Sequence, residues 1–187
     1  MNARLLASFA VLPLSLAALS CSSEAAPAVS GGAQFTLRNA AIDVNPAKLG
    51  SCPDIGAQFT VAQRGEDGKL KLVADGADDA RVSCSVSGNR FSVSVSRAAA
   101  AFIASGTVVG TQSTDAEVTF VTDTNVYKTR EKKCTIDIDE NANGRFRGRV
   151  TCPIVEHNKL PNACASTGEA GADDKTKTYF SFANCTG

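Results

Sequence analysis

The segment Cys134 to Cys152, CTIDIDENANGRFRGRVTC, decides the fold class, because it alternates apolar and polar side chains on both sides of a turn signal. A period of two is typical of half-buried strands, so the segment predicts a β-hairpin. We place a three-residue loop at Ala142-Asn143-Gly144, where Gly144 supplies the left-handed conformation. This loop pairs Cys134 with Cys152, Ile136 with Val150, Ile138 with Gly148 and Glu140 with Phe146 on one face, and Thr135 with Thr151, Asp137 with Arg149 and Asp139 with Arg147 on the other.

This register has three consequences that support one another. It separates an apolar face from a charged face, sets aspartates opposite arginines, and brings two cysteines into bridging position. A two-residue Asn143-Gly144 turn would shift the register by one residue and remove all three. The segment therefore predicts a Cys134–Cys152 disulfide.

A second hairpin is predicted over Arg81 to Arg97, RVSCSVSGNRFSVSVSR. Gly88-Asn89 has glycine first, as a type II′ turn prefers. Cys84 then lies on the apolar face with the valines, and the serines form the opposite face. A hydroxylated ligand could bind such a face, but small hydroxyls on a sheet are usually its solvated side, which is what we expect here.

Further short alternating runs, separated by turn residues, predict an all-β fold, either an antiparallel β-sandwich or a barrel. The length suits one domain, which we place at residues 33–187. The additional strands are expected at Gln34–Val44, Ala57–Ala62, Leu70–Ala74, Ala100–Val109, Ala116–Thr122 and Tyr179–Asn184.

The N-terminal residues have the layout of an export signal, with a basic start at Met1–Arg4 and an apolar run at Leu5–Leu19. The sequence Ala17-Ala18-Leu19-Ser20-Cys21 resembles the lipobox of bacterial lipoproteins. The resemblance implies a signal peptide at 1–20, a lipid on Cys21, and attachment to a membrane of the cell envelope. Ser22 follows instead of Asp, which implies the outer membrane. Residues 21–32 are expected to form the lipidated end and a flexible tether.

The alternative is ordinary signal cleavage around Ala25 or Ala26, with Cys21 discarded. The cysteine count supports export, which both interpretations share. Seven cysteines are present, so an even set of six remains when Cys21 is set aside. Such a set suits three disulfides in an oxidising compartment.

Six thiols allow 15 pairings. Beyond Cys134–Cys152, we pair Cys52 with Cys84, the core-facing cysteine nearest in sequence, which leaves Cys164 with Cys185. No CxxC pair occurs and His157 is the single histidine, so the sequence supports neither a zinc site nor a redox motif.

Charge and aromatic content argue against several partner classes. Removing residues 1–20 takes away one arginine and no acidic residue, which leaves 18 basic and 19 acidic side chains. This balance gives no basic footprint for nucleic acid or for an anionic membrane surface. Tryptophan is absent and the nine phenylalanines are scattered, so no stacking platform for bases or sugars is indicated.

The clearest metal-ligand pattern is Asp139-Glu-Asn141-Ala-Asn143-Gly144, which resembles the D-x-N-x-N-G opening of calcium loops. The twelfth position of such a loop would be Val150, where a bidentate Glu is expected. Arginines also crowd the segment, and the hairpin accounts for the same residues. We therefore expect no bound metal and keep calcium binding through Asp139, Asn141 and Asn143 as an alternative.

Catalytic candidates are weaker still. His157 lies in a polar segment that predicts a loop, and no nucleophile or orienting carboxylate is apparent beside it. The pair Asp173-Asp174 is also expected in a loop. We therefore expect a non-catalytic lipoprotein without cofactors, whose β domain binds an envelope protein or a surface polymer or serves structurally. A calcium- or ligand-binding module is the alternative, and a hydrolase around His157 a weaker third.

Overall fold

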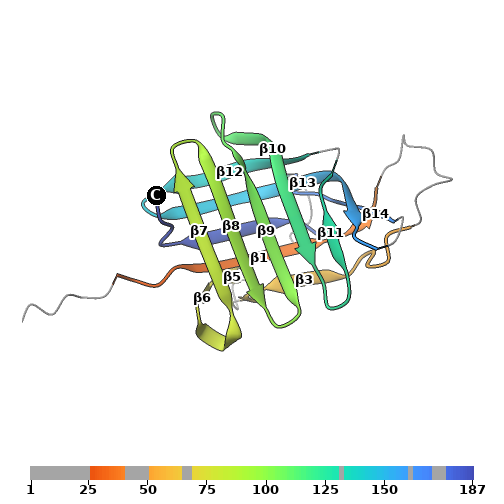
Figure 1. The fold of residues 1–187 in the computed structure, drawn as a ribbon, viewed down its shortest axis with the longest axis horizontal. Helices are drawn as coiled ribbons and strands as arrows, with labels where there is room; N and C mark the ends of the chain where they lie inside the picture. The colour runs from red at the N-terminus through yellow and green to blue at the C-terminus, as the bar shows by residue number, and fades with distance from the viewer. Residues whose placement is uncertain (1–25, 41–50, 65–68, 131–132, 160–161, 170–175) are drawn as a thin grey trace, which may run out of the picture.

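The computed structural model describes residues 26–40, 51–64, 69–130, 133–159, 162–169 and 176–187 (Figure 1). Within these ranges the chain is all-β, as predicted, with one 3₁₀ turn, η1, at Ala77–Asp79. The strands are β1 (Ser30–Thr36), β2 (Arg38–Asn39), β3 (Gln58–Val61), β4 (Gln63–Arg64), β5 (Leu70–Lys71), β6 (Val73–Ala74), β7 (Arg81–Ser87), β8 (Arg90–Arg97), β9 (Ala100–Thr107), β10 (Gln112–Val121), β11 (Val126–Lys128), β12 (Cys134–Ala142), β13 (Arg145–His157), β14 (Ala163–Ser166) and β15 (Tyr179–Ala183).

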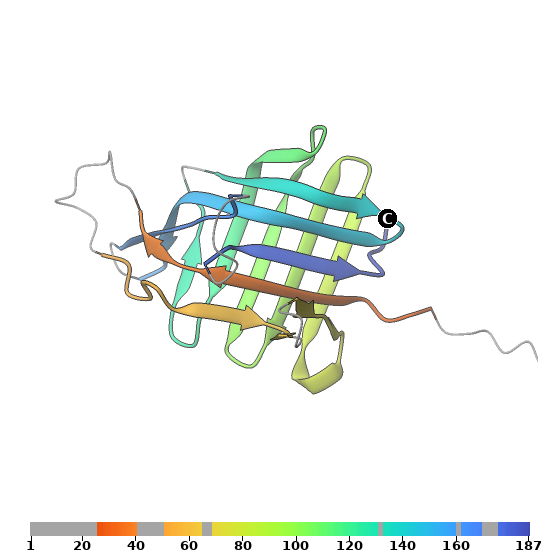
Figure 2. The same cartoon turned by 180° about the vertical axis from the view of Figure 1, so that it is seen from behind.

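Thirteen strands form one antiparallel sheet that folds over on itself into two layers (Figures 1 and 2). The front layer in Figure 1 contains β7, β8, β9, β10 and β11, and the rear layer contains β12, β13, β15, β1 and β3. Two long strands join the layers. The start of β10 pairs with β12 and its end with β9 and β11, while β13 pairs with β12 and β15 and then with β11 and β14.

Aromatic rings fill the space between the layers. Strand alternation points every second side chain inward, so each strand contributes apolar groups from one face. The Phe35 ring contacts the Phe120 ring at 4.8 Å between centroids, and Phe102 stacks on Phe180 at 5.5 Å. Six phenylalanines have less than 2% of their surface exposed, so they dominate the hydrophobic stabilisation of the fold: Phe35, Phe102, Phe120, Phe146, Phe180 and Phe182.

The Cys134–Cys152 hairpin has the predicted register at its base. Pairing runs as expected from Thr135 opposite Thr151 to Ile138 opposite Gly148. The disulfide between Cys134 and Cys152 is present, and both residues are fully buried. Charge pairing and the apolar face therefore follow from the sequence pattern in this part of the hairpin.

The predicted three-residue loop of this hairpin is wrong. Ala142 pairs with Arg145, so Asn143 and Gly144 form a two-residue turn, and their φ angles of 53° and 70° are those of a type I′ turn. A bulge at Asp139 absorbs the extra residue and restores the register below it. The predicted pairs of Glu140 with Phe146 and of Asp139 with Arg147 are therefore wrong as well.

The second predicted hairpin is confirmed along its whole length. Strands β7 and β8 pair from Arg81 opposite Ser96 to Ser87 opposite Arg90, and Gly88 has a φ of 59° in the turn. Cys84 is buried, as expected.

The other two disulfides differ from the predicted pairs. The structure joins Cys52 to Cys164 and Cys84 to Cys185, so the predicted Cys52–Cys84 and Cys164–Cys185 pairs are wrong. Proximity in sequence was a poor guide, because the chain end runs beside β7 and the Cys52 segment runs beside β2 and β14. The Cys52 amide donates to Asn39 Oδ1 at 2.9 Å, which brings Cys52 to Cys164, the pairing partner of Asn39.

The flexible tether was predicted to extend to Gly32, but the folded domain begins before that residue. Strand β1 begins at Ser30, and Gly31 and Gly32 are buried within it. A Cβ atom on Gly31 would lie 2.5 Å from the Phe182 ring, and one on Gly32 would lie 2.8 Å from Ala62 Cβ. These glycines permit close packing instead of flexibility. The signal peptide and Cys21 lie outside the described residues.

Other differences concern strand ends. The predicted strand from Gln34 splits at Leu37, and its last residues, 41–44, lie outside the described residues. Strands β4, β11 and β14 were not predicted, because they are only two, three and four residues long. Strand β13 continues to His157, where a loop was predicted.

Candidate functional site

The three calcium candidates lie along β12 and its turn, where Asp139 is already paired. Arg149 Nε donates to the two carboxylate oxygens of Asp139 at 3.1 and 3.3 Å. Asn141 pairs with Phe146 in the strand, and Asn143 occupies the turn. Among the described residues no group of three or more His, Cys, Asp or Glu side chains is arranged to hold a metal ion. A guanidinium therefore lies where a calcium loop would need its cation.

His157 is not in a loop but at the end of β13, where it is 5% exposed. Its Nδ1 accepts a hydrogen bond from the Lys159 amide at 3.0 Å, so Nδ1 carries no proton. Nε2 must then carry the proton, and it donates to Asn125 Oδ1 at 2.8 Å. The ring edge also packs against Tyr127, with ring centroids 5.4 Å apart.

A polar network, which we call the Asp54 cluster, continues from Asn125. The Asp54 carboxylate accepts three hydrogen bonds at Oδ2. They come from Tyr127 Oη at 2.7 Å, Thr122 Oγ1 at 3.0 Å and Asn125 Nδ2 at 3.1 Å. Asp54, Thr122, Asn125, Tyr127 and His157 thus form one connected set from three parts of the chain.

The ionisation of the cluster follows from these contacts. Burial acts to raise the pKa of Asp54, but hydrogen bonds from Tyr127, Asn125 and Thr122 outweigh it, so the pKa lies below its ordinary value. Burial and the adjacent Asp54 carboxylate raise the pKa of Tyr127 well above its ordinary value. At neutral pH the cluster therefore holds an ionised aspartate and a neutral tyrosine that donates to it.

The Asp54 cluster is suited to holding the chain together. Thr122 donates its hydroxyl proton to the carboxylate, and each ring nitrogen of His157 has a partner within the protein. The network fastens the segment around Asp54 to the β10–β11 turn and to the end of β13. A nucleophile with a free base beside it, which covalent nucleophilic hydrolysis uses, is not found in this set.

Sequence reasoning singled out His157 from this set and missed Asp54, Thr122, Asn125 and Tyr127. The turn sequence Thr-Asp-Thr-Asn at 122–125 is a local signal for side chains that hydrogen-bond the backbone. Nothing local indicates Asp54, which is 68 residues before Thr122. The other catalytic candidate, Asp173-Asp174, lies outside the described residues.

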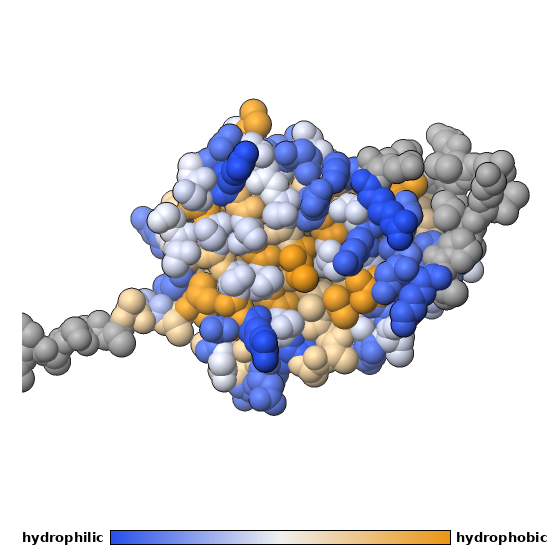
Figure 3. All heavy atoms as spheres, in the orientation of Figure 1, coloured by the Kyte–Doolittle hydropathy of each residue, from blue (hydrophilic) through white to orange (hydrophobic). Residues whose placement is uncertain are grey.

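The outer face of β7, β8 and β9 carries rows of small hydroxyls, which we call the hydroxyl face. Facing pairs cross the strands, from Ser85 to Ser92 and on to Ser105. Ser83 and Ser94 share a hydrogen bond between their Oγ atoms at 2.9 Å. Ile103, opposite Ser94, is 44% exposed. Figure 3 shows this face mostly pale, with an orange patch near its middle and dark blue residues to its right.

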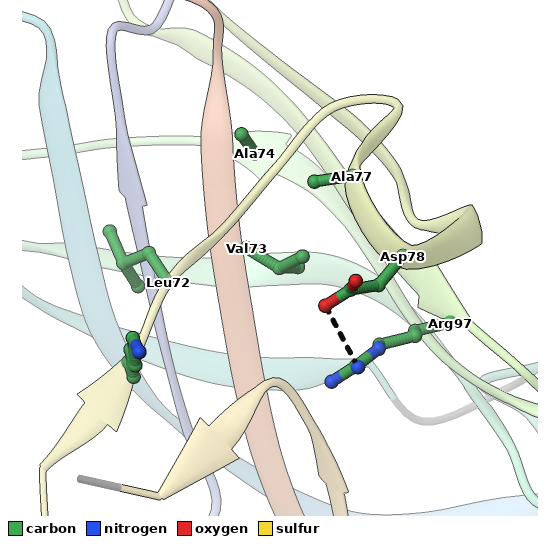
Figure 4. A pocket seen from close by; sticks show the side chains of 7 residues that line it. Leu72, Val73, Ala74, Ala77, Asp78 and Arg97 are labelled. Carbon is green, nitrogen blue, oxygen red and sulfur yellow. Dashed lines mark hydrogen bonds and ion pairs between the residues drawn. The ribbon is translucent and has the colours of Figure 1, made fainter.

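A small hollow of about 170 Å³ lies beside η1 (Figure 4). Leu72, Val73 and Ala74 form one wall, and Arg97 Nη2 bonds to Asp78 Oδ2 at 3.0 Å on the other. Because the hollow is small, it offers little room to a drug-sized ligand.

No helix within the described ranges is long and apolar enough to span a bilayer. Comparison of the chain with protein-family models, curated proteins and solved structures finds no match. Function must therefore be inferred from the residues and geometry of this chain.

Proposed function

We propose that this protein is a lipid-anchored β domain of the bacterial cell envelope, attached to the outer membrane, that acts by binding instead of catalysis. One observation carries the proposal. Six of the seven cysteines form three disulfides, and the remaining one, Cys21, directly follows the apolar export segment.

The disulfides support export, and two of them connect distant parts of the domain. Such bonds form and persist in oxidising compartments, and they are rare where the cytoplasm keeps thiols reduced. Two of them join residues 112 and 101 positions apart, so they staple the folded domain as a whole. A lipid on Cys21 would use the one cysteine that the three disulfides leave over.

Binding is favoured because the polar side chains of the Asp54 cluster hydrogen-bond to one another. The hydroxyl face supplies a broad surface, with Ile103 as an exposed apolar group among small polar side chains. No aromatic platform accompanies it, so we favour an envelope protein over a surface polymer as the partner.

The anchor is tested by expressing the full chain in a bacterium with two membranes and determining the mass of its N-terminal peptide. We expect a diacylglycerol-modified Cys21 at the new N-terminus and recovery of the chain with the outer membrane. The Cys21→Ser variant, with the same export segment, should be free of lipid. A mature N-terminus near Ala25 or Ala26 without lipid would overturn the proposal.

Binding through the hydroxyl face is tested with a photo-crosslinking residue at Ser94, and with the same residue at Arg147 on the rear layer as a control. Both positions lie on paired strands. We expect a discrete crosslinked protein from position 94 alone, and its loss in Ile103→Arg. Identical products from both positions, or none from position 94, would contradict the assignment.

A further inference from the structure

We propose that the domain stands end-on on the membrane and that a hollow at its anchored end binds a phospholipid headgroup. This inference rests on the proposed lipid at Cys21. The anchored end is defined by three segments: Ala28–Val29, the turn Ala142–Arg145, and Asn184–Gly187. Figures 1 and 2 show the N-terminal segment leaving the domain at the end where the β12–β13 turn and the C-terminus lie.

Hydrogen bonds hold these three segments together. Asn184 Nδ2 donates to the Ala28 carbonyl at 2.9 Å, and the Cys185 amide donates to the Gly144 carbonyl at 2.8 Å. The Asp75 amide donates to the Val29 carbonyl at 2.9 Å, just before β1 pairs with β15. The chain is therefore attached to the domain from Ala28 onward.

The reach of the remaining chain limits the orientation. From Cys21 to Ala28 there are seven peptide steps, which span at most about 25 Å when fully extended. Strand β13 runs from Arg145 at the anchored end to His157 at the opposite end, with an extended length of at most about 40 Å for 13 residues. A lipid on Cys21 therefore holds the Ala28 end close to the membrane, and the His157 end lies on the far side of the domain from it.

The chemistry of the anchored end suits a headgroup. A hollow of about 260 Å³ lies between the β12–β13 turn and the chain end, and Asn141, Asn143, Arg145 and Thr186 are among its lining residues. The Arg145 side chain is 57% exposed, and its Nε lies 3.4 Å from Glu140 Oε1. A guanidinium binds phosphate with two donors in parallel, and the asparagine amides supply further donors. The hollow thus offers a positive group and amides at the end nearest the lipid.

The orientation is tested by fluorescence, because the chain contains no tryptophan. One tryptophan is introduced by Ala142→Trp at the anchored end or by Lys159→Trp at the opposite end, since both positions are exposed. Each full-length lipidated variant is placed in vesicles of phosphatidylethanolamine and phosphatidylglycerol, with and without a spin-labelled headgroup lipid. We expect a several-fold larger loss of fluorescence at position 142 than at position 159.

The headgroup contact is tested by adding Arg145→Gln to the Ala142→Trp variant, with Arg147→Gln as a matched control. Both arginines are exposed on β13 and both changes remove one charge. We expect weaker quenching with Arg145→Gln and unchanged quenching with Arg147→Gln. Equal effects of the two changes would overturn the headgroup site, and equal quenching at positions 142 and 159 would overturn the end-on orientation. If the chain carries no lipid and does not float with the vesicles, the lipid anchor itself fails, which is a separate outcome.

Discussion

Thr186 pairs in parallel with Ser85 along the outer edge of β7. The Thr186 amide donates to the Cys84 carbonyl at 3.0 Å, and its carbonyl accepts from the Val86 amide at 2.8 Å. The Cys84–Cys185 disulfide holds this short segment in place. An edge strand with open backbone groups is prone to pair with other chains, so the chain end protects β7 from aggregation.

Replacing both Cys84 and Cys185 by Ala should therefore do more than lower stability. For a loop of this length we expect a loss of about 4.7 kcal/mol in the free energy of unfolding by urea, plus faster hydrogen exchange at the Val86 amide. The Cys134–Cys152 disulfide closes a shorter loop. Replacing both of its cysteines by Ala should therefore lower the free energy of unfolding by about 3 kcal/mol without exposing the Val86 amide. Unchanged exchange at Val86 in the first variant would show that the disulfide does not hold the edge.

Gly31→Ala should destabilise the domain, because its Cβ would lie 2.5 Å from the Phe182 ring and 2.9 Å from Val82 Cγ1. Overpacking of this kind costs about 1–3 kcal/mol, read from the urea midpoint. Gly110→Ala is the control, since nothing lies within 4 Å of its Cβ and its φ of +65° should cost about 1 kcal/mol. If Gly31→Ala has wild-type stability, the close packing of β1 against Phe182 is incorrect.

Asp54→Asn should make the free energy of unfolding depend less steeply on pH in acid solution. Because the folded-state pKa of Asp54 lies below its ordinary value of 3.8, its contribution is complete above that pH and is lost as pH falls through the folded value. Unfolding free energies measured from pH 6 down to about pH 2 should therefore fall less steeply in the variant. Asp123→Asn, an exposed change in the adjacent turn, is the control for removing one carboxylate from this region. A curve as steep in Asp54→Asn as in the wild type would contradict the stabilising role of Asp54.

Tyr127→Phe removes one of the three donors to Asp54 and leaves the buried ring in place. We expect a loss of about 1–3 kcal/mol at neutral pH, because the bond joins a hydroxyl to an ionised carboxylate. Thermal melting or urea unfolding measures this change. A loss that is the same in the Asp54→Asn background would show that the two side chains are not energetically coupled.

Millimolar calcium should not raise the melting temperature of the protein, because the Asp139 carboxylate already accepts a hydrogen bond from Arg149. A calcium-dependent rise would revive the calcium-binding alternative, since any ligand of the folded state stabilises it. Such a rise should then disappear in Asp139→Asn, which distinguishes a site at the hairpin from binding elsewhere.

Sequence patterns within a short segment predicted the pairing registers of the two hairpins. The β7–β8 register followed from alternation and one glycine, because a shift by one residue would have turned every valine to solvent. The base of the Cys134–Cys152 hairpin followed for the same reason. Its tip did not, because a bulge at Asp139 absorbs one residue without changing which face is buried.

The sequence by itself determined the all-β class, two hairpins, one disulfide and the expectation of export, since each depends on residues close together in the chain. Only the tertiary structure decided the Cys52–Cys164 and Cys84–Cys185 pairs, the Asp54 cluster and the packing role of Gly31. These features bring together residues far apart in sequence, as in Asp54 and Tyr127, 73 positions apart. Strand order brings them together, and alternation within a strand carries no information about which strands become neighbours.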